Sequence, residues 1–192
     1  MKNLKLTILT VIVALSSLNS MAKDEIKLKR IMDEVIVDIT PEEAWKVINS
    51  YGDVGAYHTS ILSSRSMNGS QNEGEIGCER ECTIDNGNKD IVVVEKIIDY
   101  REGEYYRYEV TKSDNFPIQK FYNTFGVKVN DLGQTVIYVI TEYRLDPGFM
   151  IGLFKNKLAK GNHQALIAYK HYMETGEKNA DPKMLKKKYK NS

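Results

Sequence analysis

The sequence predicts an α+β fold in which a curled antiparallel sheet of about seven strands wraps around one long C-terminal helix. Between residues 61 and 145, short strand-like segments alternate with turns rich in Gly, Asn and Asp, at the spacing of an antiparallel meander. After Pro147 the apolar residues change to helical spacing, up to about Thr175. One amphipathic helix cannot cover both sides of so large a sheet, so we expect the sheet to curl and to leave an internal cavity beside the helix.

The first 22 residues have the pattern of a removable export signal. Two lysines precede an apolar run over residues 6–15, and the small residues Ser20 and Ala22 follow it. The run is short for a membrane-spanning helix, and an uncleaved anchor is the alternative. We expect cleavage after Ala22 and an exported mature chain, periplasmic or secreted, that begins at Lys23.

The charge of the chain is nearly balanced, with 27 basic and 26 acidic residues, and gives no reason to expect nucleic-acid binding. Positive charge gathers at "KMLKKKYK", Lys183–Lys190. Such a block is typical of a solvated, disordered tail, and the alternative is a tether to an anionic membrane surface. The predicted organisation is therefore a signal peptide (1–22), one domain (23–176) and a basic tail (177–192).

The elements of the domain begin with a strand over residues 27–39, followed by a helix. Thr40 has the side chain of an N-cap, Pro41 suits the first helical position, and two acidic residues occupy the first turn. This helix extends to about residue 54 in our prediction. Trp45 is assigned to the core, and a second short helical piece covers Val54 to Tyr57.

Six further strands are expected before the long helix, over residues 61–67, 77–84, 89–99, 105–111, 119–129 and 135–145. In the long helix, Phe154 and Leu158 belong to the apolar side that would lie against the sheet. Gly161 interrupts the middle of this helix and predicts a bend or a close approach.

Five short motifs follow one another in a family-like order: "TPEEAW", "YGDVGAYH", "GCER", "VVEKIIDY" and "YRYEV", and a long helix comes after them. This order resembles the START-like (SRPBCC) superfamily, with its polyketide-cyclase and Bet v 1-like helix-grip fold. The resemblance implies an apolar ligand cavity between sheet and helix, which family members use for lipids, sterols, plant hormones or aromatic polyketides. His58 is followed by Thr59, where many relatives have proline, so one lip of the cavity departs from the family pattern.

Two cysteines flank Arg80 in the stretch "GCERECTI". Because residues two apart in a strand share a face, Cys78, Arg80 and Cys82 are expected to point inward. The two cysteines would then be roughly 13 Å apart, too far for a disulfide. We expect two buried, unpaired thiols, with an intermolecular bridge as the alternative.

Metal and catalytic patterns are weak in this sequence. His58, His163 and His171 have no ligand spacing relative to the cysteines, so we expect no metal site, and no cofactor motif is present. Tyr57 and His58 lie at the expected mouth of the cavity. There His58 is either a general acid or base, or an ordinary surface residue.

A buried arginine needs a partner, because an isolated interior charge is costly. Glu95, one hairpin after Arg80, and Glu142, in the last strand, are the two candidates. Arg80 and its carboxylate are either the polar anchors of an apolar pocket or a structural ion pair.

The remaining candidate cavity residues are assigned from strand or helix phase, and core packing is the alternative role for each aromatic residue among them. They are Tyr106, Tyr108, Phe121, Asn123, Phe125, Tyr138, Phe154 and Leu158.

These observations favour a binding protein over an enzyme. The expected ligand is a small hydrophobic or amphipathic molecule, lipid-like or aromatic, in the cavity between sheet and helix. One alternative is an aromatase/cyclase-type enzyme that acts on a polyketide-like substrate in the same cavity. Another is a non-catalytic scaffold whose cavity is filled by side chains.

Overall fold

The computed structural model describes residues 27–58, 60–68 and 74–190, so the predicted signal peptide lies outside the described residues. One seven-stranded sheet has the order β1-β7-β6-β5-β4-β3-β2, and each neighbouring pair is antiparallel. The strands are β1 (Lys29–Val37), β2 (Ile61–Met67), β3 (Glu79–Ile84), β4 (Ile91–Arg101), β5 (Tyr105–Asp114), β6 (Ile118–Val129) and β7 (Thr135–Leu145). The helices are α2 (Pro41–Ile48), η1 (Tyr51–Ala56), α3 (Met150–Thr175) and α4 (Pro182–Lys188).

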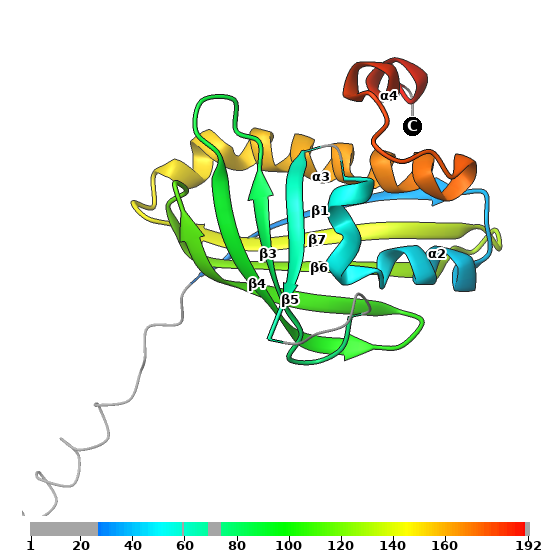
Figure 1. Cartoon of the computed structure of the whole chain (residues 1–192), viewed down its shortest axis with the longest axis horizontal. Helices are drawn as coiled ribbons and strands as arrows, with labels where there is room; N and C mark the ends of the chain where they lie inside the picture. The colour runs from blue at the N-terminus through cyan, green and yellow to red at the C-terminus, as the bar shows by residue number, and fades with distance from the viewer. Residues whose placement is uncertain (1–26, 59, 69–73, 191–192) are drawn as a thin grey trace, which may run out of the picture.

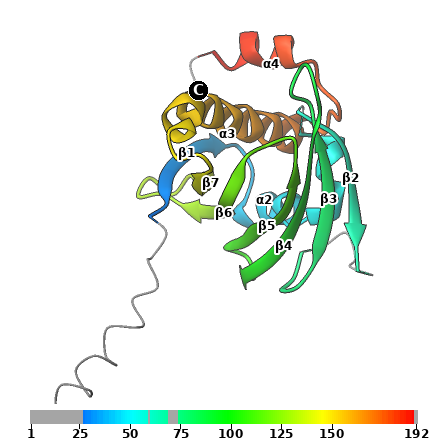
Figure 2. The ribbon, with the colours of Figure 1, turned by 90° about the vertical axis from the view of Figure 1, so that its left-hand side faces the viewer.

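The sheet curls around α3, which confirms the predicted helix-grip fold. Helix α3 runs beside β1 and β7, and the strands from β6 to β2 bend away around the space in front of it (Figures 1 and 2). Helix α2 contacts both α3 and β6, and η1 contacts β2 and β3. These two short helices therefore close one end of the curled sheet.

Helix α2 begins as its sequence predicts and ends earlier. The Thr40 hydroxyl accepts a hydrogen bond from the Glu43 backbone amide, and the Glu43 carboxylate accepts one from the Thr40 amide. After Ile48 the chain turns into the separate 3-10 helix η1, so the two short helices expected after the first strand are confirmed, but the first ends before residue 54 and the second begins earlier than predicted. The Ser64 side chain bonds the backbone of η1 at both Gly52 and Gly55, which fixes this turn on β2.

Helix α3 continues through Gly161 without interruption, and a Cβ atom at Gly161 would meet nothing within 4 Å, so the close approach considered from the sequence is wrong. Its buried residues fall in its C-terminal half and include Ala165, Leu166 and Tyr169. Gly161 lies in the less packed part of the helix, before these buried residues, so the absence of a side chain at this position removes little contact with the sheet. None of the helices among the described residues is long and apolar enough to cross a membrane.

The described part of the predicted basic tail, residues 177–190, contains a helix and is not a disordered chain. Asp181 caps α4 by accepting a hydrogen bond from the Lys183 amide, and Pro182 occupies the first helical turn. Leu185 and Tyr189 lie four residues apart on one face of this segment and are 3% and 8% exposed. Burial of this apolar face beside α3 explains why so basic a sequence is ordered.

Candidate ligand-binding site

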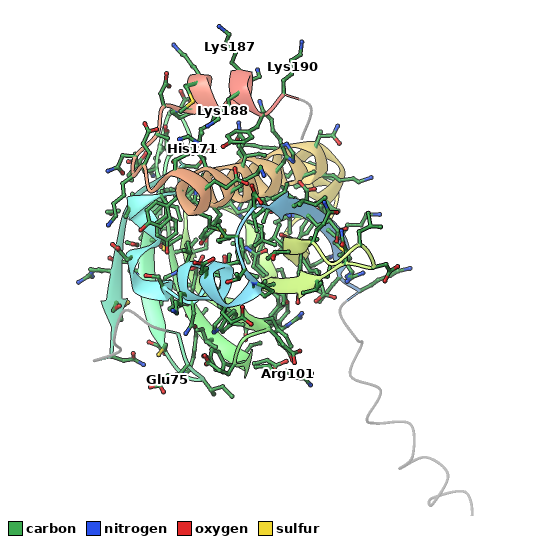
Figure 3. All side chains as sticks on the ribbon, turned by 90° about the vertical axis from the view of Figure 1, so that its right-hand side faces the viewer. Glu75, Arg101, His171, Lys187, Lys188 and Lys190 are labelled. Atoms are coloured by element: carbon green, nitrogen blue, oxygen red, sulfur yellow. The ribbon has the colours of Figure 1, made fainter. Side chains whose placement is uncertain are left out.

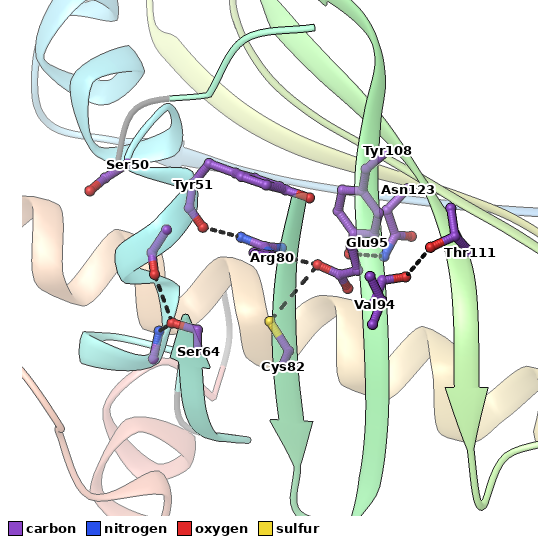
Figure 4. A network of polar contacts seen from close by, with 12 residues as sticks. Ser50, Tyr51, Ser64, Arg80, Cys82, Val94, Glu95, Tyr108, Thr111 and Asn123 are labelled. Carbon is purple, nitrogen blue, oxygen red and sulfur yellow. Dashed lines mark hydrogen bonds and ion pairs between the residues drawn. The ribbon is translucent and has the colours of Figure 1, made fainter. Parts of the chain in front are cut away.

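Arg80 forms a buried ion pair with Glu95 inside the curled sheet. The two residues are direct partners in the β3–β4 register, and 2.5 Å separates Arg80 Nε from Glu95 Oε2. They are 2% and 5% exposed. Arg80 also donates from its terminal nitrogen to the Tyr51 carbonyl oxygen at 2.6 Å (Figure 4). Of the two carboxylates considered from the sequence, Glu95 is thus the partner.

Aromatic rings cover the guanidinium of Arg80. Its central carbon lies 4.0 Å from the ring centroid of Tyr51 and 5.3 Å from that of Tyr108. Burial disfavours the charged form, but Glu95 and the neighbouring groups more than offset it and raise the pKa of Arg80 well above its usual value. Arg80 is therefore charged, neutralised and enclosed, which makes it a structural element of this interior.

The two cysteines beside Arg80 point inward and neither forms a disulfide, as predicted. The Cys82 thiol lies 3.9 Å from Glu95 Oε2, and burial raises the pKa of Cys82 to about 12. A thiol with so high a pKa is a poor nucleophile and a poor metal ligand. Among the described residues, there is no group of three side chains able to hold a metal ion.

Aromatic side chains fill the centre of the interior next to the ion pair. Tyr106, Tyr108 and Phe125 lie inside, as their strand phase predicts. Their rings contact those of Tyr51 and Tyr169 at centroid distances of 5.4 to 6.4 Å. The centre of the predicted cavity is therefore occupied by the protein's own side chains.

Three buried tyrosine hydroxyls have no hydrogen-bond partner among the described residues: those of Tyr51, Tyr106 and Tyr143. Burial raises the pKa of Tyr106 to about 12 and that of Tyr51 further, so both hydroxyls stay protonated. Buried polar groups in native proteins are almost always paired with protein, ordered water or ligand. Tyr51 and Tyr106 belong to the filled aromatic centre, whereas Tyr143 lies beside half-buried Phe121, so the Tyr143 hydroxyl is the one placed to meet a polar group that enters the interior.

A polar chain leads from the Tyr108 ring towards α3. The Asn123 amide donates to the Tyr108 hydroxyl at 2.7 Å, the Thr141 hydroxyl donates to Asn123 Oδ1 at 2.5 Å, and the Asn162 amide donates to Thr141 at 2.9 Å. Asn123 and Asn162 are half-buried although they face the inside of the fold. This part of the interior is therefore more accessible than the aromatic centre.

Apolar side chains surround this accessible part. Phe154 on α3 contacts Phe116, in the β5–β6 connection, edge to face at 5.1 Å, and Phe121 lies beside Tyr143. Phe121, Phe154 and Leu158, each a predicted cavity residue, are half-buried. The N-terminal half of α3 and the facing strands thus form an apolar region with a neutral polar chain at its inner end.

Tyr57 and His58 lie in the corner that η1 builds. Tyr57 is buried, its ring stacks on Tyr172 at 5.0 Å, and its hydroxyl donates to the Ser50 carbonyl oxygen. Burial and the charge of Arg80 lower the pKa of His58 to about 4, so its imidazole is neutral at neutral pH. Its Nδ1 accepts from the Ser60 amide at 3.3 Å. His58 is half-buried, and its ring lies edge to face against that of Tyr169 at 6.4 Å, so it is at the edge of the interior.

Two predicted cavity residues, Tyr138 and Glu142, lie on the outer face of the sheet, and their assignment is wrong. Glu142 pairs with Arg107 on that face, and both side chains are 26% exposed. The Tyr138 ring lies over Gly126, where a Cβ atom would collide with it. The inward residues of β7 are those of the other phase, including Thr141 and Tyr143.

Sequence reasoning missed several interior polar residues. Tyr51 belongs to a 3-10 turn, where neither strand nor helix period applies. Asn162 follows Gly161 in α3 and could have been found, because a polar side chain on the sheet side of a helix requires a partner. Thr141 and Tyr143 were missed because the wrong phase was chosen for β7.

Comparisons with known proteins agree with this geometry. A family described as "Polyketide cyclase / dehydrase and lipid transport" matches residues 30–168. Among solved structures, Ara h 8.0201 has 17% identity and a TM-score of 0.62, covering 77% of this chain and 98% of its own. Protein XoxI from Bacillus cereus has 15% identity and a TM-score of 0.58, over 75% and 94% of the two chains.

Major latex-like protein 151 from Panax ginseng has 9% identity and a TM-score of 0.53, over 71% and 97%. No curated protein matched. At these identities the solved structures show the fold alone, whereas the family match spans most of the chain. The protein therefore belongs to the polyketide cyclase / dehydrase and lipid transport family, within the START-like (SRPBCC) superfamily.

Proposed function

We propose that this protein is an exported binding protein that holds a small amphipathic molecule between the sheet and the N-terminal half of α3. The observation that carries the proposal is the buried Tyr143 hydroxyl, which has no hydrogen-bond partner among the described residues and belongs to an inward-facing residue of β7. Half-buried Phe121 and Phe154 supply apolar contacts nearby. Ligand sites commonly combine an apolar lining with a few placed polar groups in this way.

The ligand we propose is neutral and carries a hydroxyl or carbonyl oxygen. Glu95 already neutralises Arg80, and aromatic rings cover the guanidinium, so an acidic ligand would find no free positive charge there. Tyrosine hydroxyls and the Asn123 amide can satisfy a neutral oxygen. Side chains fill the aromatic centre, as in the alternative of a scaffold with a filled cavity. The ligand is therefore limited to the accessible part of the interior beside the N-terminal half of α3.

Native mass spectrometry of protein purified from its own cell envelope tests this proposal, because a bound neutral molecule adds a defined mass. Paired probes then test its chemistry: decanol and decanoate have the same chain and differ in charge. We expect decanol to bind more tightly, and Tyr143→Phe to weaken decanol binding by roughly 0.5–1.5 kcal/mol, the net value of one neutral hydrogen bond. Tighter binding of decanoate, or no binding of either probe, would contradict the proposal.

Export is a separate part of the proposal. N-terminal sequencing of envelope-extracted protein should give Lys23 as the first residue, and an intact Met1 in the membrane fraction would overturn this assignment. We also propose that the basic segment Lys183–Lys190 contacts an anionic membrane surface, because its lysines Lys183, Lys186 and Lys187 are exposed on α4.

A further inference from the structure

A groove of about 470 Å³ lies between α3 and α4, on the side of α3 that faces away from the sheet's inward tyrosines. This volume is within the range of small-molecule sites. Its lining residues come from both helices and from the end of the chain: Lys160, His163, Gln164, Ile167, Pro182, Lys183, Leu185, Lys186, Lys187, Tyr189 and Lys190.

The floor of the groove is apolar and its rim is basic. Ile167, Leu185 and Tyr189 are buried. The rim lysines form no ion pair among the described residues; they are Lys160 on α3 and Lys183, Lys186, Lys187 and Lys190 in the C-terminal segment. By contrast, Lys170, further along α3, is paired with Glu174. Figure 3 shows Lys187 on α4, and Lys190 just after the end of α4, on the outer side of the C-terminal segment. Unpaired positive charge beside an apolar surface is complementary to an anionic amphiphile.

A buried histidine holds the wall of the groove in place. His171 is 2% exposed and contacts the Tyr189 hydroxyl through Nδ1 at 3.0 Å and the Glu177 carboxylate through Nε2 at 2.9 Å. The Lys188 ammonium lies 3.4 Å from the same Nδ1, beneath α4. The groove is therefore a built feature of the packed C-terminus.

We infer that this groove binds an anionic phospholipid of a membrane surface. The lysines meet the phosphate headgroup, and Ile167, Leu185 and Tyr189 receive part of the apolar chain. The inference rests on the proposed membrane contact and deepens it, because a site that requires both headgroup and chain differs from a diffuse attraction between charges. It is independent of the interior, which lies on the opposite side of α3.

Vesicle sedimentation tests the inference with phosphatidylcholine vesicles that contain or lack phosphatidylglycerol. The groove variant is Lys183→Gln/Lys187→Gln. Its matched control, Lys155→Gln/Lys157→Gln, removes the same charge from exposed positions of α3 outside the groove. We expect binding only to phosphatidylglycerol vesicles, about 30-fold weaker for the groove variant if each lysine contributes its usual share, and nearly unchanged for the control.

A competition experiment distinguishes binding of a whole lipid molecule from binding of its phosphate charge alone. Dihexanoyl phosphatidylglycerol below its micelle concentration should displace the protein from vesicles, whereas inorganic phosphate at equal ionic strength should not. Equal weakening of both lysine variants, or equal displacement by phosphate, would overturn the groove and leave a diffuse membrane contact. Absence of wild-type binding to phosphatidylglycerol vesicles would overturn both. Thermal melts of both variants establish that they are folded.

Discussion

Replacing Arg80 by methionine should strongly destabilise the protein without any ligand present. The change removes the 2.5 Å contact with Glu95 and the 2.6 Å bond to the Tyr51 carbonyl oxygen. It leaves the Glu95 carboxylate 5% exposed, with the weakly donating Cys82 thiol beside it. Breaking a buried ion pair from one side costs about 3–5 kcal/mol. For a domain of this size, the melting temperature should fall by roughly 6–20 °C.

Urea unfolding at neutral pH measures this loss, and Arg107→Met is its matched control. Arg107 also pairs with a glutamate, Glu142, which lies on the far side of β6 in the sheet, but this pair is on the outer face, where 26% of each side chain is exposed. An exposed pair contributes at most about 1 kcal/mol. The double variant Arg80→Met/Glu95→Leu should recover much of the stability, because it leaves no stranded charge. If Arg80→Met costs no more than Arg107→Met, the structural role given to Arg80 is refuted.

Three further outcomes follow from burial. His58 has a pKa of about 4 in the folded protein and about 6.5 when unfolded, so the unfolded chain binds the proton first as pH falls. The free energy of unfolding is therefore full above about pH 6.5 and declines by up to about 3 kcal/mol towards pH 4. In His58→Gln, the free energy of unfolding should depend less steeply on pH in that window, and an unchanged dependence would contradict the assignment. Thiol titration without reductant should find Cys78 and Cys82 unreactive in the folded protein and both reactive once it is unfolded, and a single reactive thiol would disagree with this. Deletion of residues 182–192 should lower the free energy of unfolding by about 2 kcal/mol through loss of the buried Leu185, and a melting temperature equal to that of the full chain would mean that α4 contributes no packing.

The sequence predicted the inward phase correctly where the two faces of a strand differ in polarity. In β3, Glu79, Glu81 and Thr83 mark one face as the wetter one, so Arg80 had to point inward. In β7 the pattern is ambiguous, because Val136 and Ile140 on the outer face are as apolar as the inward residues. That ambiguity placed Glu142 in the cavity, and only the β1 and β6 pairings of the folded sheet resolve it.

The sequence did not predict that the C-terminal segment packs beside α3, because its many lysines suggested a solvated chain. The lysines of α4 dominate its composition, and composition predicts a solvated tail. The decisive residues are Leu185 and Tyr189, four apart, since they give the segment one apolar face despite its lysines. A segment this short has no stable helix of its own, so its order depends on a partner surface that the local sequence does not contain.

The polarity of the interior changes from the ion pair towards α3, and this change determines whether a charged or a neutral ligand can bind there. At the inner end, the charges of Arg80 and Glu95 cancel and are enclosed by rings, so they hold the strands together without offering a free charge. Towards α3, Asn123 and Thr141 offer only neutral hydrogen bonds. A charged ligand would lose its hydration on entry and find no opposite charge in return, a cost that exceeds the value of one or two neutral hydrogen bonds. A neutral oxygen-bearing molecule loses far less on entry, and for this reason the preference for decanol over decanoate follows from the ion pair as much as from the tyrosine hydroxyls.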